Sequence, residues 1–453
     1  MEVLQHECGV ALVRTIGQSK RNCIADAKQL IRLQRHRGRQ GAGIASANFA
    51  VTKFNGDGAI DKLLSAPISP SHIALGHVRY ATNGNESIEA VHPFISSNGR
   101  LALCGNFHFG KCYDAADGRN ITEKIAALLE RYTLCEALNI ALADTSGGFV
   151  LCGITADGQT FAIRDRHGIR PAYYSLTDNY VAIASERFAL EQILPDANAT
   201  ELPAGHAIIS GSDGNTNITR ILTPGIPAAC PFERIYFSSA ADKEIADVRQ
   251  RLGQSLAAQI SELLGPTPRP TLLTYVPNSA YHAWQGLANA LGNSVIAAAI
   301  LEKTISGRTF ITGPTERAGE VSNAYRLNAN AFAFSGHDII IVDDSIVRGT
   351  TFRDSNLLPL LGTLTPGRII IASSAPPVLF ADYYGIDIPN SDVLIATKAT
   401  DGHKNVDASR VAELIHPSGF TTPLSVVYQS VEALKAVLGP GYGTWVFTGD
   451  YPC

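Results

Sequence analysis

Ile339–Thr351 reads IIIVDDSIVRGTT, and this stretch decides the fold of the carboxy-terminal half of the chain. Four β-branched residues, Ile339–Val342, predict a short strand buried on both faces, as in a parallel sheet. Asp343 and Asp344 then mark its carboxyl end, where open α/β sheets bind ligands, and they can hold hydroxyl groups or a hydrated divalent cation. Gly349–Thr351 offers backbone N–H groups and hydroxyls to a phosphate. The pattern predicts a sugar-phosphate site.

The composition indicates a globular protein and excludes several other classes. Hydrophobic residues make up 45% and charged residues 17% of 453 residues, enough for two or three domains with cores of their own. A net charge of -4 and a pI near 6.3 argue against a nucleic-acid binder. Met1–Glu7 lacks the basic start and apolar run of a secretory signal, and no segment approaches a membrane span, so we expect a cytoplasmic protein without a membrane partner.

The eight cysteines show neither Cys-x-x-Cys spacing nor the density of a disulfide scaffold. We therefore expect most of them to be reduced and buried.

The amino-terminal half is predicted to form layered sheets covered by helices. Short β-rich segments alternate with Gly, Asn and Asp turns, and helices are expected near 22–35 and 121–129. The predicted strands of this half are Gly9–Val13, Ser71–Leu75, Leu101–Leu103 and Gly148–Cys152.

The pattern changes after Pro231 to that of an open parallel α/β sheet. Apolar residues at helical spacing predict one helix over Ala240–Leu264, stopped by Gly265 and Pro266. Strands and helices then alternate, and Pro359 is expected to kink or shorten a helix over Thr351–Leu361. The elements predicted in between are the strands Thr271–Val276, Ser294–Leu301, Asp338–Val342 and Arg368–Ser373 and the helix Ala280–Leu291.

The loop after Val342 resembles the signature loop of type I phosphoribosyltransferases, which bind 5-phosphoribosyl-1-pyrophosphate. The amino-terminal half carries, in order, motifs similar to those of glutamine amidotransferases with an N-terminal nucleophile. With two further motifs downstream, the chain resembles the amidophosphoribosyltransferase family over nearly its full length. The motifs are Cys8, His36–Gly38, Ala42–Ile44, Gly76–Thr82, Cys104–Asn106, Arg164–Pro171, Ala184–Glu186, Gly307–Ile311 and Tyr384–Asp387.

The resemblance implies a domain organisation and a reaction. Residues 1–7 would be a propeptide, 8–230 an N-terminal-nucleophile glutaminase domain of αββα layers, and 231–453 a type I phosphoribosyltransferase domain of the α/β class. The reaction would form 5-phosphoribosylamine, glutamate and pyrophosphate from phosphoribosyl pyrophosphate, glutamine and water, the entry step of purine synthesis. Cys8, as the new first residue, would attack the glutamine amide with its own α-amino group as base.

Two departures fall in the glutamine site. The family's oxyanion-hole Asn precedes a Gly-Asn pair, and Cys104 stands there before Gly105 and Asn106. The family's Asp that holds the glutamine amino group is replaced by Ile121. Losing one oxyanion donor costs about 10²–10³ in rate, unless Asn106 or a backbone N–H substitutes, so the changes suggest impaired glutamine hydrolysis. Arg79 and Thr82, which in the family hold the glutamine carboxylate region, are retained with Gly105 and Asn106 as glutamine-binding residues.

The resemblance also assigns the phosphoribosyl-pyrophosphate site. Mg²⁺ would sit with Ser279, Asp343 and Asp344, while Asn278 and Ala280 depart from an acidic residue and a Gly in the family's pyrophosphate loop. The substrate-binding set is Asp343, Asp344, Ser345, Arg348, Gly349, Thr350, Thr351, Ser279 and Arg308, the last in a flap of which the later basic cluster is thinned to Arg326.

Some family members carry an iron–sulfur cluster, but this chain retains one of the four ligand positions. Cys230 matches the first, whereas Asp382, Gly443 and Val446 occupy the others. One ligand cannot hold a cluster, so no iron–sulfur cluster is expected and Cys230 is interpreted as structural.

Three functions remain open at this stage. The first is the glutamine-dependent transferase, and the second uses free ammonia with a degraded glutaminase. The third is a non-catalytic paralogue that binds phosphoribosyl pyrophosphate or nucleotides and regulates another enzyme. The family resemblance further implies purine nucleotides as effectors and a homo-oligomer.

Overall fold

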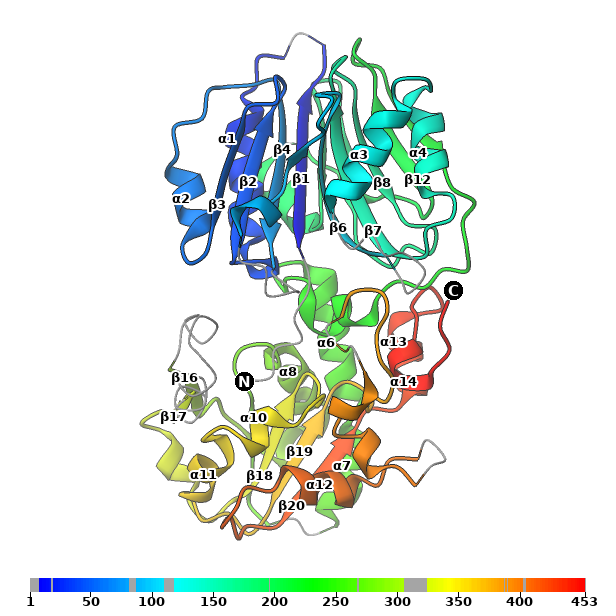
Figure 1. Cartoon of the computed structure of the whole chain (residues 1–453). Coiled ribbons are helices and arrows are strands. Elements are labelled where there is room, and N and C mark those ends of the chain that lie inside the picture. The colour runs from blue at the N-terminus through cyan, green and yellow to red at the C-terminus, as the bar shows by residue number, and fades with distance from the viewer. Residues whose placement is uncertain are drawn as a thin grey trace.

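The computed structural model describes residues 8–17, 19–80, 87–109, 118–194, 196–266, 269–304, 324–386, 388, 390–401 and 405–452. These residues form two layered bodies joined through helix α6 (Lys243–Ser255), with two antiparallel sheets in one body and a parallel sheet in the other (Figure 1). No helix in the described ranges is long and apolar enough to cross a membrane.

Two antiparallel sheets make up the amino-terminal body. In the described residues the first has the strand order β11-β9-β10-β1-β4-β2-β3 and the second the order β13-β12-β8-β7-β6-β5. Their bounds are β1 Gly9–Thr15, β2 Gly41–Ser46, β3 Val51–Asn55, β4 Ile73–Arg79, β5 Phe94–Ile95, β6 Leu101–Phe109, β7 Gly147–Thr155, β8 Thr160–Arg164, β9 Tyr173–Leu176, β10 Tyr180–Ala184, β11 Thr200–Glu201, β12 His206–Ser210 and β13 Thr216–Arg220.

The two sheets pack face to face, and helices cover their outer faces, so the predicted αββα layering is confirmed (Figure 1). Val10 and Leu12 of β1 point into the space between the sheets, while Ala11 and Val13 point outward under α1, as the period of two along a strand requires. The helices are α1 Cys23–Leu33, α2 Ala59–Ser65 and α5 Arg187–Ile193 on one side and α3 Gly118–Leu128 and α4 Leu134–Leu142 on the other.

A parallel sheet of order β15-β14-β18-β19-β20 forms the carboxy-terminal body, as predicted. Strand β18 is buried along its whole length, because alternate residues Ile339 and Ile341 face one helical layer and Ile340 and Val342 face the other. The bounds are β14 Thr271–Tyr275, β15 Ile296–Ala297, β18 Asp338–Asp343, β19 Ile369–Ser373 and β20 Leu424–Tyr428, with β16 Leu301–Lys303 and β17 Tyr325–Leu327 in a separate pair. The helices are α7 Ala257–Leu264, α8 Tyr281–Leu291, α10 Thr350–Arg353, α11 Leu357–Gly362, α12 Ala408–Ile415, α13 Val431–Leu438 and α14 Trp445–Thr448.

The single helix predicted over Ala240–Leu264 is wrong, because the structure has two helices, α6 and α7, with a break at Leu256. The side chain of Gln429 donates to the carbonyl of Leu252 at 2.9 Å and takes an acceptor that a continuous helix would use. Leu256 instead bonds to Gly253, three residues back. A contact from far along the chain thus ends a helix that its own sequence would continue.

Two other predicted elements are also divided. The strand Ser294–Leu301 becomes β15 and β16, which belong to different sheets. The helix Thr351–Leu361 becomes α10 and α11, and Pro359 lies in the first turn of α11, where a missing N–H costs little. The expected shortening by Pro359 is confirmed.

A buried charge network joins the two bodies. Arg37, in the short 3₁₀ helix η1 (Arg35–Arg37), contacts Glu186 before α5 and binds Glu233 with its Nη2 2.7 Å from Oε1. Glu233 begins a π-helix, η3 (Glu233–Phe237), and Arg249 of α6 donates to the carbonyls of Tyr236 and Ser238 at its end. Arginines therefore hold both ends of the segment that connects the bodies.

Candidate active site

The nucleophile candidate Cys8 stands directly before β1 at one end of the space between the sheets. Its thiol lies 3.9 Å from the carbonyl oxygen of Tyr80, and Gly9 pairs with Val78 of β4. Since Val10 and Leu12 face the second sheet, the alternation of β1 directs Cys8 to the same side. By the same rule, Arg79 shares the inner face of β4 with Ile73 and Leu75.

The second sheet brings Asn106 to this end of the sandwich. Ala102 and Cys104 of β6 lie in the core between the sheets, so Asn106 is the next residue on that face. Cys104 contacts Gly76 through its thiol, and Gly105 contacts His77. One step further along both strands, Asn106 comes level with Val78, the partner of Gly9.

Cys104 is buried in the core between the sheets. Its thiol lies 3.5 Å from the carbonyl oxygen of Gly76, and burial raises its pKa well above the usual value of a thiol. A neutral, fully buried thiol is inert as a nucleophile.

Ile121 and Thr82 are two further positions of the predicted glutamine site. Ile121 packs in the core under α3 with Leu101 and Leu103, so no carboxylate stands at that position. Thr82 lies outside the described residues.

The second candidate site is at the carboxyl end of β18, as predicted. Asp343 ends the strand, and its carboxylate accepts the N–H of Asp344 at 2.9 Å. Ser345 donates to one oxygen of Asp344 at 3.4 Å, whereas Oδ2 of Asp344 is buried without a hydrogen-bond partner among the described residues. An orphaned buried carboxylate oxygen is expensive unless a ligand satisfies it.

Ser279 comes to the same place from the neighbouring strand. Strand β14 pairs in parallel with β18, Tyr275 opposite Val342, so the loop after β14 and the loop after β18 meet at one edge. Burial raises the pKa of Asp344, and a hydrogen bond from Ser279 and the charge of Arg249 act in the opposite direction. Asn278 is exposed and Ala280 is buried in the core, where a larger residue would not fit without repacking.

The loop after Asp344 turns into α10 through Gly349. This residue has φ +75°, in the left-handed region, and a Cβ there would lie 2.7 Å from Ile415. Glycine is therefore required both for conformation and for space. Thr350 and Arg348 are half-buried, Thr351 is buried, and Arg308 lies outside the described residues.

Three residues near the aspartates were missed by the sequence analysis. Lys303, exposed at the end of β16, is close enough to Asp344 and Asp343 for their charges to act on its pKa. Burial raises the pKa of Tyr236 and of Tyr325, and the same two carboxylates add to the effect. These residues come from three separate segments, so no local sequence pattern could have grouped them.

Tyr236 also connects the two candidate sites. The ionisable groups that act on it include Tyr80, whose carbonyl contacts Cys8, as well as Asp343 and Asp344. Groups of both candidate sites therefore lie near Tyr236 in the π-helix η3.

Two of the four positions compared above with cluster ligands, Cys230 and Val446, lie in one core of the carboxy-terminal body, and the other two contact Trp445 of that core. Asp382 accepts the N–H groups of Tyr384, Gly385 and Ile386, and the indole Nε1 of Trp445 donates to it at 2.6 Å. A Cβ at Gly443 would lie 1.9 Å from the Trp445 ring. A buried Trp–Asp pair thus fills this region beside Cys230.

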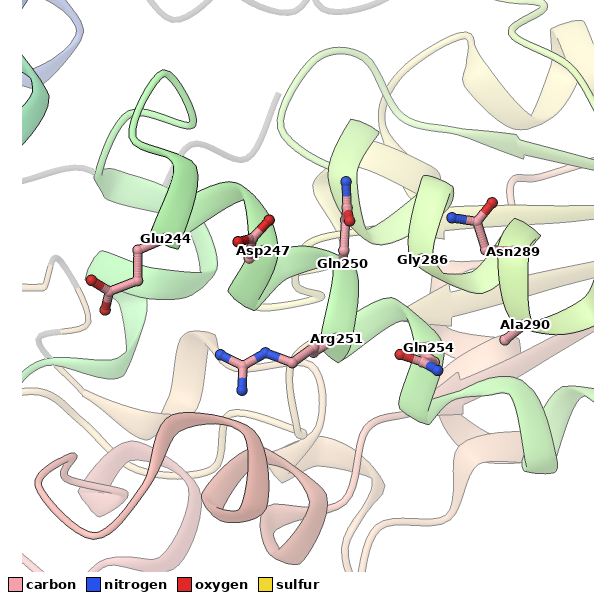
Figure 2. A pocket seen from close by; sticks show the side chains of 8 residues that line it. All are labelled: Glu244, Asp247, Gln250, Arg251, Gln254, Gly286, Asn289 and Ala290. Atoms are coloured by element: carbon pink, nitrogen blue, oxygen red, sulfur yellow. The ribbon is translucent and has the colours of Figure 1, made fainter.

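A polar groove of about 580 Å³ lies between α6 and α8, apart from both candidate sites (Figure 2). The helices cross closely beneath it, since a Cβ at Gly286 would lie 1.8 Å from the carbonyl oxygen of Gln250. Its lining residues are Glu244, Asp247, Gln250, Arg251, Gln254, Gly286, Asn289 and Ala290, none of them singled out by the sequence analysis.

The amino-terminal body is an αββα sandwich with a cysteine before its central strand, and it is joined to a parallel sheet with two aspartates at a strand end. This combination defines a glutamine-dependent phosphoribosyltransferase. No protein-family model matches the chain. The curated amidophosphoribosyltransferase of Staphylococcus epidermidis is 31% identical over 456 aligned positions, covering 92% of this chain and 86% of the relative. The chain belongs to the amidophosphoribosyltransferase family.

One further relative and one solved structure bear names of the same kind. The chloroplastic amidophosphoribosyltransferase 2 of Arabidopsis thaliana is 26% identical and covers 99% of this chain and 80% of its own length. The solved glutamine phosphoribosylpyrophosphate amidotransferase of B. subtilis, complexed with ADP and GMP, has a TM-score of 0.77 at 26% identity, over 98% of this chain and 97% of that one.

Proposed function

We propose that this chain forms 5-phosphoribosylamine from phosphoribosyl pyrophosphate and glutamine, releasing glutamate and pyrophosphate. Glutamine and water give glutamate and ammonia in the amino-terminal body. The nitrogen of ammonia then bonds to C1 of the ribose as the bond from C1 to pyrophosphate breaks. The family membership supports this reaction, as does Tyr236, on whose pKa Tyr80 from one candidate site and Asp343 and Asp344 from the other act.

In the glutaminase half, Cys8 is the proposed nucleophile. After removal of Met1–Glu7, its α-amino group would accept the thiol proton and the thiolate would attack the side-chain carbonyl of glutamine. Arg79 and Thr82 would hold the glutamine carboxylate. We assign the oxyanion to the side-chain amide of Asn106, because it follows Ala102 and Cys104 on the inner face of β6 and the N–H of Gly105 is already donated to His92.

In the transferase half, one observation carries the assignment: Oδ2 of Asp344 is buried without a partner beside Asp343 and Ser279. A ribose hydroxyl or the water shell of Mg²⁺ would satisfy this oxygen. No group of three or more His, Cys, Asp or Glu side chains that could hold a metal ion occurs in the described ranges.

Ser279, Asp343 and Asp344 would hold Mg²⁺, which when bound would neutralise charge on the departing pyrophosphate. Gly349–Thr351 would bind the 5-phosphate with backbone N–H groups and hydroxyls, with Ser345 and Arg348 beside them. Arg308 would cover the substrate.

The burial of Ile121 favours a second candidate, in which free ammonia is the main nitrogen donor. No carboxylate stands at that position to hold the glutamine amino group, and a charge-assisted hydrogen bond of this kind is worth about 1.5–3 kcal/mol. Glutamine affinity would then fall by about tenfold or more.

One experiment separates the candidates. Phosphoribosylamine formation is measured with glutamine and with ammonium for the wild type and for Cys8→Ala. The glutamine-dependent enzyme loses turnover with glutamine alone, and the ammonia-dependent enzyme shows little glutamine turnover before the substitution. Absence of product with either donor would contradict both and leave the non-catalytic paralogue.

We further propose the domain boundary at residue 230, a cytoplasmic location, a homo-oligomer and purine nucleotides as effectors. The solved B. subtilis relative complexed with ADP and GMP supports the last of these.

A further inference from the structure

Two histidines contact the backbone of Gly105, one at its carbonyl oxygen and the other at its N–H. His77 of β4 lies with Nε2 3.1 Å from the carbonyl oxygen of Gly105, and the N–H of Gly105 donates to Nδ1 of His92 at 3.1 Å. The two rings stack with centroids 4.2 Å apart and 20° between their planes. Gly105 directly precedes Asn106, the residue to which the oxyanion is assigned above.

These contacts fix the protonation of both rings. A carbonyl oxygen can only accept, so His77 carries its proton on Nε2, and its Nδ1 is buried without a hydrogen-bond partner among the described residues. A backbone N–H can only donate, so Nδ1 of His92 accepts and its proton is on Nε2. Each ring therefore has one required tautomer.

Burial keeps both rings neutral. It lowers the pKa of His77 to about 3 and that of His92 well below the usual range, against the raising effect that the Gly105 carbonyl has on His77. Lys53 and Arg79, the cations that act on both rings, lower the values further. A second proton on His92 would place a donor against the N–H of Gly105, so the neutral form is the one that can bind this peptide.

We propose that His77 and His92 are positioning residues that clamp the backbone of Gly105 and thereby set the amide of Asn106 against the reacting carbonyl of glutamine. His92 holds the peptide group before Gly105 and His77 holds the one after it, which leads directly into Asn106. A shift of about 1 Å in an oxyanion donor is enough to cost much of its effect. The proposal rests on the glutaminase function above.

The alternative is that the rings are aromatic packing. His92 also contacts the rings of Phe94 and Phe107, with centroids 4.4 and 5.7 Å away. The two roles make opposite demands on replacements. An amide side chain can restore the hydrogen bond without the ring, and an apolar side chain can fill the space without the hydrogen bond.

The test compares matched variants. In His92→Asn the amide oxygen takes the place of Nδ1, and in His77→Gln the amide nitrogen takes the place of Nε2. His92→Leu and His77→Leu fill the volume and remove the bond. We expect the Leu variants to lose about tenfold or more in kcat/KM for glutamine, and the amide variants to stay within about threefold of wild type.

Ammonia-dependent turnover is the control for folding, because it needs the second body and not the clamp. It should stay within about twofold of wild type in all four variants. If the Leu variants do not fold, the amide variants still decide. A packing role predicts that the amide variants lose turnover with glutamine, and this result would overturn the proposal. Leu variants with unchanged glutamine turnover would overturn it as well.

A measurement without catalysis separates this proposal from the proposed function. Amide hydrogen exchange of a peptide covering β6 should accelerate at Gly105 in His92→Leu, which removes the acceptor of this N–H, and remain protected in His92→Asn. Unchanged exchange in His92→Leu would refute the clamp whatever the wild type does with glutamine. A wild type that exchanges as expected yet does not hydrolyse glutamine would refute the glutaminase alone.

Discussion

Replacing Arg37 should test whether the two bodies depend on one buried cation. The Arg37 side chain has an exposed fraction of 0%, and its partners Glu186 and Glu233 have 3% and 6%. Burial would raise the pKa of Glu186, but the charges of Arg37 and His36 outweigh it and lower the pKa. Without Arg37, two carboxylates from different bodies would share a dry site with less compensation.

The expected cost follows from the burial. Removing one partner of a buried pair typically costs 3–5 kcal/mol, roughly the upper range for a single substitution. With a urea m-value of about 3 kcal/mol/M, Arg37→Met should lower the unfolding midpoint by about 1–1.7 M. Arg35 lies in the same 3₁₀ helix, but its pair with Asp61 is 3.4 Å long with exposed fractions of 50% and 66%. Arg35→Met should therefore cost about 1 kcal/mol or less.

Urea titrations followed by circular dichroism give both values. A second substitution, Glu233→Gln, made in the Arg37→Met background should recover part of the loss, since it removes one of the unpaired charges. If Arg37→Met unfolds at the same midpoint as Arg35→Met, the network does not hold the bodies together and the reasoning fails.

Three further predictions use other contacts. The pKa of His77 is about 3 in the folded chain and about 6.5 when unfolded, so its stabilising contribution is complete above pH 6.5 and is lost as pH falls toward 3. His77→Gln should reduce the loss of unfolding free energy between pH 7 and 5 by about 2 kcal/mol, and equal losses in urea titrations at the two pH values would contradict this. Asp382→Asn should destabilise the chain by about 1.5–3 kcal/mol in urea titrations, because the Asp382 carboxylate accepts three backbone N–H groups and the indole N–H of Trp445. An unchanged unfolding midpoint would show that the charge is dispensable. Gly349→Ala should raise the KM for phosphoribosyl pyrophosphate by about tenfold through strain of about 1–2 kcal/mol. The control Gly336→Ala, at a residue with φ +81° and nothing within 4 Å of an added Cβ, should leave this KM unchanged. Equal KM values in the two variants would count against a role for the Gly349 loop.

Sequence-based prediction was most accurate for elements whose structure depends on residues adjacent to them in the chain. The strand before Asp343 is apolar at every position because both faces are buried, and the loop that follows carries its own chemistry in consecutive residues. Asn22 caps α1, with its side chain accepting the N–H of Ile24, which explains why the predicted start of this helix is right to within one residue. Pro359 likewise acts on its own helix.

Sequence-based prediction failed for features that depend on contacts with residues far along the chain. Gln429 ends α6 by bonding to Leu252, and nothing near Leu252 in the sequence announces this. Tyr236 and Lys303 reach the aspartates from other strands and helices, so their role depends on the packing of the sheet. Asn106 is an intermediate case, because the alternation along β6 was readable, whereas its level beside Cys8 required the register between two sheets.

The junction, more than either site alone, determines how this enzyme would work. Groups of both candidate sites lie near one short π-helix, because Tyr80, Asp343 and Asp344 all act on the pKa of its Tyr236. Arg37 holds the start of that helix from the glutaminase side, and Arg249 holds its end from the transferase side while its charge acts on Asp344. If ammonia released at Cys8 passes this helix to reach the second site, replacing Arg37 should reduce the glutamine-dependent formation of phosphoribosylamine more than the reaction with free ammonia.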